Sequence, residues 1–120
     1  MDVRATWCGP CRAQIPHLKK LEEEFHGQDV VVVSYSVDAP KGLQKWKDMV
    51  ADAELGGVQL IGDAAFKSSI TVDCTIKGIP RFLLFVREGN IVTIDAPRPS
   101  DPKLKETILK VLWVGVGQVP

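Results

Sequence analysis

The 120-residue chain has only three cysteines and no hydrophobic run long enough to cross a bilayer. Three cysteines are too few for a framework of structural disulfides, and the odd number fits one working pair with one single thiol. A membrane-spanning helix needs about 20 consecutive apolar residues, so we expect no stable insertion of this chain into a membrane. The N-terminus also lacks a basic segment followed by an apolar one, so no export signal is visible in the sequence.

An excess of either charge is absent as well, because 15 basic and 15 acidic residues cancel. A neutral chain offers no electrostatic reason to expect a nucleic acid or an anionic membrane as its partner. Hydrophobic residues make up 45% of the chain, which is enough for a core that needs no metal or structural disulfide. We expect one domain over residues 1–113, followed by an irregular C-terminal tail over residues 114–120.

Hydrophobic periodicity predicts helices and strands that alternate along the chain. The expected helices cover residues 10–25, 39–50 and 63–70, with Asp63 as an N-cap, and a last helix begins near residue 100. The expected strands are a short N-terminal one, residues 30–37, and a hairpin formed by residues 81–86 and 91–94. This pattern predicts a three-layer α/β/α fold with the order β-α-β-α-β-β-α and a mixed four-stranded sheet. The order resembles that of the smallest thioredoxin-like domains.

The segment Trp7-Cys8-Gly9-Pro10-Cys11 lies at the start of the first predicted helix. Two cysteines three apart can close a disulfide within one turn, and the positive end of the helix dipole stabilises a thiolate on the first of them. The thiolate is the attacking species in disulfide exchange, so we expect Cys8 to be exposed and to attack the substrate. Cys11, one turn further in, is expected to be buried and to resolve the mixed disulfide. Gly9 allows a tight turn, Pro10 presets the first helical φ, and Trp7 shields one side of the pair.

Paired cysteines with this spacing also occur in zinc sites. A zinc site needs two more ligands, and the only candidates are Cys74, His17 and His26, none of which forms a second pair with zinc-like spacing. We expect Cys74 to pack as a small hydrophobic residue and both histidines to lie on the surface. The glycine and proline between Cys8 and Cys11 favour a redox pair that uses no metal and no separate cofactor.

Three blocks of sequence carry a family resemblance: residues 5–12 (ATWCGPCR), 77–84 (KGIPRFLL) and 95–101 (DAPRPSD). With these blocks the chain resembles the thioredoxin superfamily, and more closely the TlpA-like (ResA-like) thiol–disulfide oxidoreductases of the bacterial cell envelope, particularly the forms common in Bacteroidetes. The resemblance implies that Pro80 is a cis-proline facing the cysteine pair, which would expose the backbone of Ile79 to an extended substrate segment. It also implies that Asp2 is a buried acid that takes the proton from Cys11. An ordinary trans-proline and an exposed terminal aspartate are the alternatives.

Two departures from the family pattern change what we expect. Arg4 stands where the family usually has a large aromatic residue, which predicts looser packing around the pair. The sequence begins almost inside the first motif, so we expect it to be truncated at the N-terminus and to lack the family's N-terminal strand. Without that strand, residues 30–37 are expected to form an open hydrophobic edge. This edge predicts marginal stability or self-association.

The resemblance implies a thiol–disulfide oxidoreductase that reduces or exchanges disulfides in exported proteins and is re-reduced by an upstream protein reductant. It implies the periplasm or cell envelope as the location, with the cytoplasm as the alternative. The Gly-Pro dipeptide indicates a reducing pair rather than a strong oxidant. A peroxiredoxin-like peroxidase is a second candidate, although its threonine should stand three residues before the reactive cysteine and Thr6 stands two before Cys8. A non-enzymatic metal or cytochrome-maturation thiol chaperone is a third.

Overall fold

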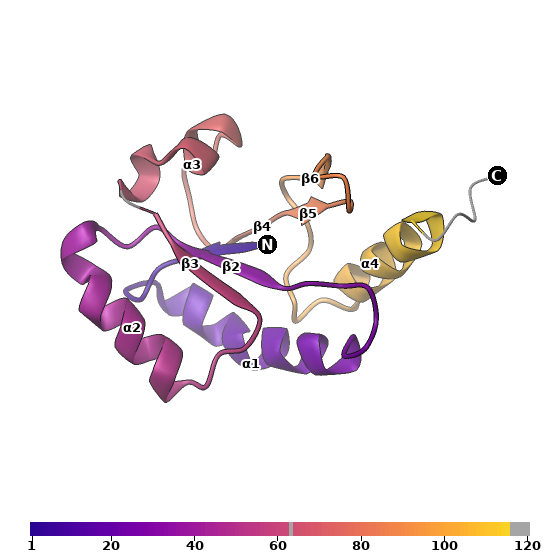
Figure 1. The fold of residues 1–120 in the computed structure, drawn as a ribbon, viewed down its shortest axis with the longest axis horizontal. Helices are drawn as coiled ribbons and strands as arrows, with labels where there is room; N and C mark the ends of the chain where they lie inside the picture. The colour runs from indigo at the N-terminus through magenta and orange to yellow at the C-terminus, as the bar shows by residue number, and fades with distance from the viewer. Residues whose placement is uncertain (63, 116–120) are drawn as a thin grey trace.

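A mixed four-stranded sheet lies at the centre of the computed structural model, which describes residues 1–62 and 64–115 (Figure 1). Its strands stand in the order β3 (Val58–Ile61), β2 (Val33–Ser36), β1 (Asp2–Arg4) and β4 (Arg81–Phe82). The first three are parallel, whereas β4 runs antiparallel to β1. Beyond β4 the chain forms a two-stranded antiparallel hairpin of β5 (Leu84–Phe85) and β6 (Ile91–Thr93). The expected thioredoxin-like α/β fold with a mixed four-stranded sheet is confirmed, but the expected strand 81–86 is divided between β4 and β5, and the hairpin strand β6 lies outside the four-stranded sheet, which contains β3 instead.

In the described part of the chain, three α-helices connect the strands, α1 (Gly9–Glu24), α2 (Leu43–Asp52) and α3 (Ser69–Asp73), and a fourth, α4 (Pro102–Gly115), follows the last strand. Short 3-10 turns, Pro40–Gly42 and Ala65–Lys67, precede α2 and α3. The helices expected over residues 10–25, 39–50 and from residue 100 are present, whereas the one expected over residues 63–70 is replaced by the turn Ala65–Lys67 and the later helix α3. The last one reaches Gly115, so it includes residues 114 and 115 of the expected tail, while Asp63 and residues 116–120 lie outside the described part of the chain. None of the described helices is both long and apolar enough to span a membrane.

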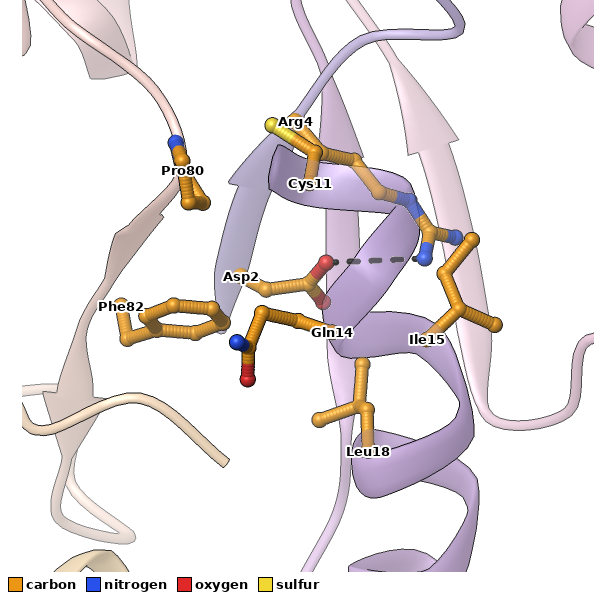
Figure 2. A pocket seen from close by; sticks show the side chains of 8 residues that line it. All are labelled: Asp2, Arg4, Cys11, Gln14, Ile15, Leu18, Pro80 and Phe82. Carbon is orange, nitrogen blue, oxygen red and sulfur yellow. Dashed lines mark ion pairs between the residues drawn. The ribbon is translucent and has the colours of Figure 1, made fainter. Parts of the chain in front are cut away.

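Side chains that alternate along β1 divide the interior into two regions. Val3 packs into an apolar cluster with side chains that include Val37, Cys74 and Ile76. On the opposite face, Asp2 and Arg4 point toward α1 (Figure 2). A second apolar cluster joins α1 to α4 and the β4 region through Leu21, Phe25, Phe82, Ala96, Leu104 and Ile108. The start of α1 therefore packs in the first cluster through Cys11, and its end packs in the second through Leu21.

Strand β3 was not predicted from the sequence, and it overturns one expectation. β2 pairs with β1 on one side and with β3 on the other, so the open edge expected at residues 30–37 is wrong. The self-association inferred from that edge loses its structural basis. Gly57 lets β3 approach, because it adopts φ +67 and a Cβ there would lie 2.5 Å from the carbonyl oxygen of Val32.

Candidate redox site

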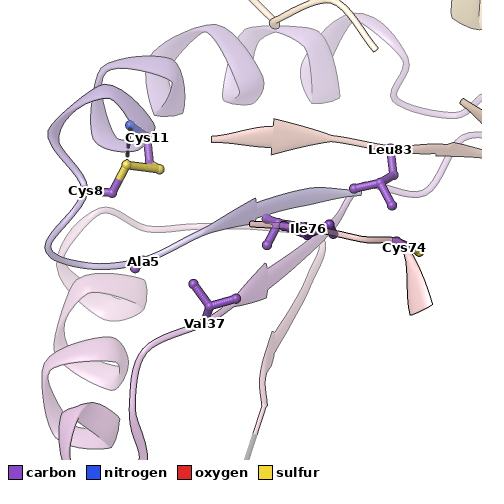
Figure 3. Close-up of a cluster of buried hydrophobic side chains, with 8 residues drawn as sticks. Ala5, Cys8, Cys11, Val37, Cys74, Ile76 and Leu83 are labelled. Atoms are coloured by element: carbon purple, nitrogen blue, oxygen red, sulfur yellow. Dashed lines mark hydrogen bonds between the residues drawn. A yellow bond between two sulfur atoms is a disulfide. The ribbon is translucent and has the colours of Figure 1, made fainter. Parts of the chain in front are cut away.

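Cys8 and Cys11 are joined by a disulfide at the N-terminus of α1 (Figure 3). Their Cα atoms are 5.2 Å apart. Cys8 is the N-cap of the helix, Pro10 occupies its first turn, and the backbone N–H of Cys11 donates to the Sγ of Cys8 at 3.2 Å. An N-terminal N–H and the positive end of the helix dipole both favour negative charge on this sulfur. The local geometry therefore suits Cys8 as the thiolate once the pair is reduced.

The two cysteines do not differ in exposure as the sequence predicted. Cys8 is 5% exposed and Cys11 is 3% exposed, so the expectation of an exposed Cys8 is wrong for the disulfide form. The reason is that Cys8 packs in the same apolar cluster as Ala5 and Val37 (Figure 3). The residues next to Cys8 are in contact with solvent instead: Trp7 is 64% exposed, and Gly9 and Pro10 are exposed as well.

The peptide bond between Ile79 and Pro80 is cis, as the family resemblance implied. Pro80 and Cys11 line the same small hollow, with the proline opposite the start of α1 (Figure 2). Ile79 is half-buried and packs against the cluster that contains both redox cysteines. The loop that carries this bond thus lies beside the cysteine pair, and its role in binding a substrate segment stays a prediction.

A groove of about 340 Å³ continues from this loop along β4. Its lining comes from two segments that meet there, residues 78–82 and residues 95, 96 and 98. Arg81 and Asp95 form an ion pair across it, with 3.4 Å between Nη1 and Oδ1. The groove was not predicted from the sequence, because its two sides are brought together only by the hairpin.

Asp2 is buried beneath the cysteine pair, as the family resemblance implied. Its side chain is 5% exposed and lines the hollow that also contains Cys11 and Pro80 (Figure 2). The carboxylate accepts a hydrogen bond from the Oγ of Ser34 at 2.5 Å. Burial raises the pKa of Asp2, and the charge of Arg4 and the Ser34 hydrogen bond oppose that rise only in part. The alternative of an exposed terminal aspartate is wrong.

The looser packing expected around Arg4 is not found. The side chain is buried, with only 2% of the residue exposed. Its Nη2 donates to the Oε1 of Gln59 on β3 at 2.5 Å, and its Nη1 lies 3.6 Å from the Oδ2 of Asp2. Burial lowers the pKa of Arg4, and the carboxylates of Asp2 and Asp38 raise it. A buried cation therefore fills the space beside the acid.

Asp38 fixes the loop before Cys8. It is 2% exposed and accepts hydrogen bonds from the backbone N–H of Thr6 at 3.1 Å and from the Thr6 hydroxyl at 2.6 Å. The Ser36 hydroxyl donates to it as well. Its place directly after a strand is the only sequence signal that could have identified it. Because the Thr6 hydroxyl donates its hydrogen bond to Asp38, it does not donate one to Cys8, as the threonine of a peroxidase would.

The remaining candidate ligands lie apart from the pair. Cys74 is a free thiol, 8% exposed, and belongs to the apolar cluster as expected. His17 and His26 are both exposed, which confirms their expected place on the surface. Over residues 1–62 and 64–115, no group of three or more histidine, cysteine, aspartate or glutamate side chains is placed to hold a metal ion.

Several known proteins are similar to this chain in sequence and fold. A solved structure from Bacteroides vulgatus, assigned as a thiol-disulfide oxidoreductase, is 43% identical, with a TM-score of 0.78 over 94% of this chain and 72% of that one. A Chlorobium tepidum structure assigned as the thiol:disulfide interchange protein DsbE is 26% identical, with a TM-score of 0.74 over 92% of this chain and 77% of that one. Thiol:disulfide interchange protein CycY of Rhizobium leguminosarum bv. viciae is 25% identical over 118 residues, which are 98% of this chain and 60% of that protein.

These likenesses confirm the expectation of a thiol–disulfide oxidoreductase domain of the thioredoxin superfamily. The chain spans only 60% of the length of CycY, so they describe a domain and not the whole of such a protein. The Redoxin family model matches residues 2–110, which include the cysteine pair, the cis-proline and the six strands found in the described part of the chain. The chain therefore belongs to the Redoxin family.

Proposed function

We propose that this chain reduces or exchanges disulfides in protein substrates by means of the Cys8–Cys11 pair. The observation that carries the proposal is the cysteine pair at the N-terminus of α1, beside the cis-peptide bond of Pro80. No other group is needed as the electron carrier, because the two thiols themselves hold and release the two electrons. The redox-active disulfide therefore takes the place of a cofactor.

The reaction consists of two exchange steps. The Cys8 thiolate attacks one sulfur of the substrate disulfide, a mixed disulfide forms, and the other substrate sulfur leaves as a thiolate. Cys11 then loses its proton and attacks the Sγ of Cys8. This step releases the second substrate thiolate and forms the Cys8–Cys11 disulfide. Two electrons have passed from the pair to the substrate, and an upstream protein dithiol returns them by the same steps in reverse.

Asp2 is the group we assign to the proton of Cys11. It lies in the same hollow as Cys11, and no described side chain that lines this hollow besides Asp2 is a carboxylate. Because burial raises the pKa of Asp2, the carboxylate binds a proton more readily than an exposed aspartate would. Asp2 would therefore accept the proton as Cys11 becomes a nucleophile and hold it away from water.

The substrate segment would lie across the exposed rim of the site. Trp7, Gly9 and Pro10 form this rim on the side of α1. On the other side, the backbone of Ile79 beside Pro80 offers an edge with which an extended segment can pair, as in strand addition. The groove along β4 continues in the same direction and is large enough for several side chains of that segment.

We propose the periplasm or cell envelope as the location. The support is the family resemblance together with the likeness to the interchange proteins DsbE and CycY. Immunoblotting of separated periplasmic, cytoplasmic and membrane fractions tests it. Recovery in the cytoplasmic fraction would replace this location with the alternative one.

A turnover assay tests the proposed function. Reduction of a protein disulfide, with dithiothreitol as the electron donor, should proceed with the native chain and fall to the uncatalysed rate for Cys8→Ser. The matched control is Cys74→Ser, which removes the thiol outside the pair and should keep the native rate. Equal rates for the native chain and Cys8→Ser would exclude the proposal.

A further inference from the structure

In the buried ion pair next to the cysteines, the two terminal nitrogens of Arg4 have different surroundings. Arg4 is anchored at one end, because its Nη2 donates to Gln59 of the neighbouring strand β3. Its Nη1 is buried and has no hydrogen-bond partner, yet it lies 3.6 Å from the Oδ2 of Asp2 (Figure 2). Nη1 therefore acts on Asp2 through its charge rather than through a hydrogen bond.

This charge has a strong effect because water is largely excluded. The side chains of Arg4 and Asp2 are 3% and 5% exposed, and the attraction between two charges grows as the surrounding dielectric constant falls. Burial alone favours the protonated form of Asp2, whereas a cation at this distance favours the carboxylate. The two influences act in opposite directions on the same proton.

The other groups that face Asp2 leave Arg4 as its main charged partner. Gln14, Ile15 and Leu18 from α1 and Phe82 from β4 are uncharged, and Ser34 from β2 donates a hydrogen bond. The α-amino group of Met1 is the other cation near Asp2, and burial lowers its pKa. The Asp38 carboxylate lies close enough to Arg4 to share its charge.

We propose that Arg4 is a positioning residue of the exchange reaction, whose buried charge keeps Asp2 in the carboxylate form that accepts the Cys11 proton near neutral pH. The proposal rests on the role assigned to Asp2 above. Without the charge of Arg4, the acid would hold its proton to higher pH and Cys11 would attack the mixed disulfide more slowly at pH 7. The effect is on the second exchange step, while attack by Cys8 depends on the N-terminus of α1.

Reaction of the reduced protein with 5,5′-dithiobis(2-nitrobenzoate) separates these two steps. Attack by Cys8 releases one thionitrobenzoate and leaves the other on Cys8 as a mixed disulfide. Attack by Cys11 then releases the second, so the second phase measures the proposed step. The measurement is the rate of this phase between pH 5 and pH 10, in a Cys74→Ser background that removes the third thiol.

Arg4→Met removes the charge and keeps a long side chain. We expect the second phase to slow by roughly tenfold at pH 7 and to recover at alkaline pH, since one nearby charge moves such a titration by a unit or more. Gln59→Glu places a carboxylate against Arg4 and should shift the profile in the same direction, by less. Its matched control is Gln28→Glu, an exposed glutamine in a turn after α1, which should leave the profile unchanged. If Arg4→Met does not fold, Gln59→Glu decides.

Asp2→Asn separates the possible failures. A native pH profile in Asp2→Asn would remove the proton-accepting role of Asp2, and the proposal for Arg4 with it. A changed profile in Asp2→Asn combined with native profiles in Arg4→Met and Gln59→Glu would overturn the proposal for Arg4 alone. In the Asp2→Asn background, Gln59→Glu should have no further effect, and an effect there would show that Arg4 acts through another group.

Discussion

The two faces of strand β1 lie in very different interiors, although their residues are direct neighbours in sequence. Val3 is completely buried among apolar side chains that include Cys74 and Ile76. Asp2 and Arg4, on either side of it, bring a buried carboxylate and a buried cation to the opposite face. Burying apolar area stabilises a fold, whereas a buried ion pair often costs as much as it returns. The apolar face therefore supplies stability to the fold and to the cysteine pair packed in its cluster, and the charged face supplies the acid assigned to the proton of Cys11.

The largest effect is expected on the apolar face, at Ile76. Ile76→Ala removes a side chain that is 3% exposed from the cluster. We expect the free energy of unfolding of the oxidised protein to fall by about 2–5 kcal/mol, because a cavity is left behind. Denaturant unfolding measures this change. A loss below about 0.5 kcal/mol would show that the cluster does not supply the stability assigned to it.

The charged face should respond in the opposite direction when both charges are removed together. We expect Asp2→Leu combined with Arg4→Met to leave the free energy of unfolding at pH 7 unchanged or to raise it by about 1–4 kcal/mol, as for other buried ion pairs replaced by apolar residues of similar volume. The same denaturant titration measures it. A loss as large as that of Ile76→Ala would mean that both faces serve stability and that the comparison is wrong.

The pH dependence of stability sharpens the same contrast. The pKa of Asp2 is raised in the folded protein, so the folded state binds this proton more tightly than the unfolded chain does. The stability gained from that proton is fully present below the pKa of an unfolded aspartate and is lost as the pH rises through the raised pKa of Asp2. The free energy of unfolding of the native protein minus that of Asp2→Asn should therefore fall with rising pH, by at most about 1.4 kcal/mol per pH unit.

Denaturant unfolding of both proteins at a series of pH values from 4 to 9 measures this difference. Asp2→Asn serves as its own control, because the other titrating groups are shared by both proteins. A difference that stays constant or rises with pH would contradict the claim that burial raises the pKa of Asp2.

The smallest effect is expected at Thr6, in the loop between β1 and Cys8. Thr6→Val removes one hydroxyl that donates to Asp38 and leaves the backbone N–H of Thr6 and the Ser36 hydroxyl as donors. We expect a loss of about 1 kcal/mol, the usual value of one hydrogen bond. A thermal melt of the oxidised protein measures it. Thr107→Val is the control and should change less, because the half-buried Thr107 on α4 donates a single hydrogen bond to a helix carbonyl.

Features determined by neighbouring residues could be predicted from the sequence, and features determined by distant ones could not. The helix after Cys8, the pairing of Cys8 with Cys11 and the hairpin depend on short motifs. The burial of Arg4 depends on Gln59, 55 residues away, and no local pattern indicates that contact. Strand β3 is short and presents Val58 and Leu60 with more than 40% of each exposed, so its hydrophobic pattern resembles that of a loop.

The burial of Cys8 shows the same limit at the centre of the site. A cysteine at a helix N-terminus is expected to be exposed, yet Cys8 is buried in an apolar cluster with Ala5 and Val37. The cis bond at Pro80 was implied by the family resemblance, since a proline in sequence alone does not determine its isomer. Asp2 was placed correctly by the same resemblance, but its partner Arg4 was not.

Trapping of the mixed disulfide tests the central claim most directly. In Cys11→Ser the first exchange step can occur and the second cannot, so the substrate should remain covalently attached to Cys8. Mass spectrometry after incubation of the reduced variant with a disulfide substrate should show one adduct, located on the peptide that contains Cys8 and removed by dithiothreitol. The account is contradicted if the reduced variant forms no adduct, or if the adduct is on Cys74.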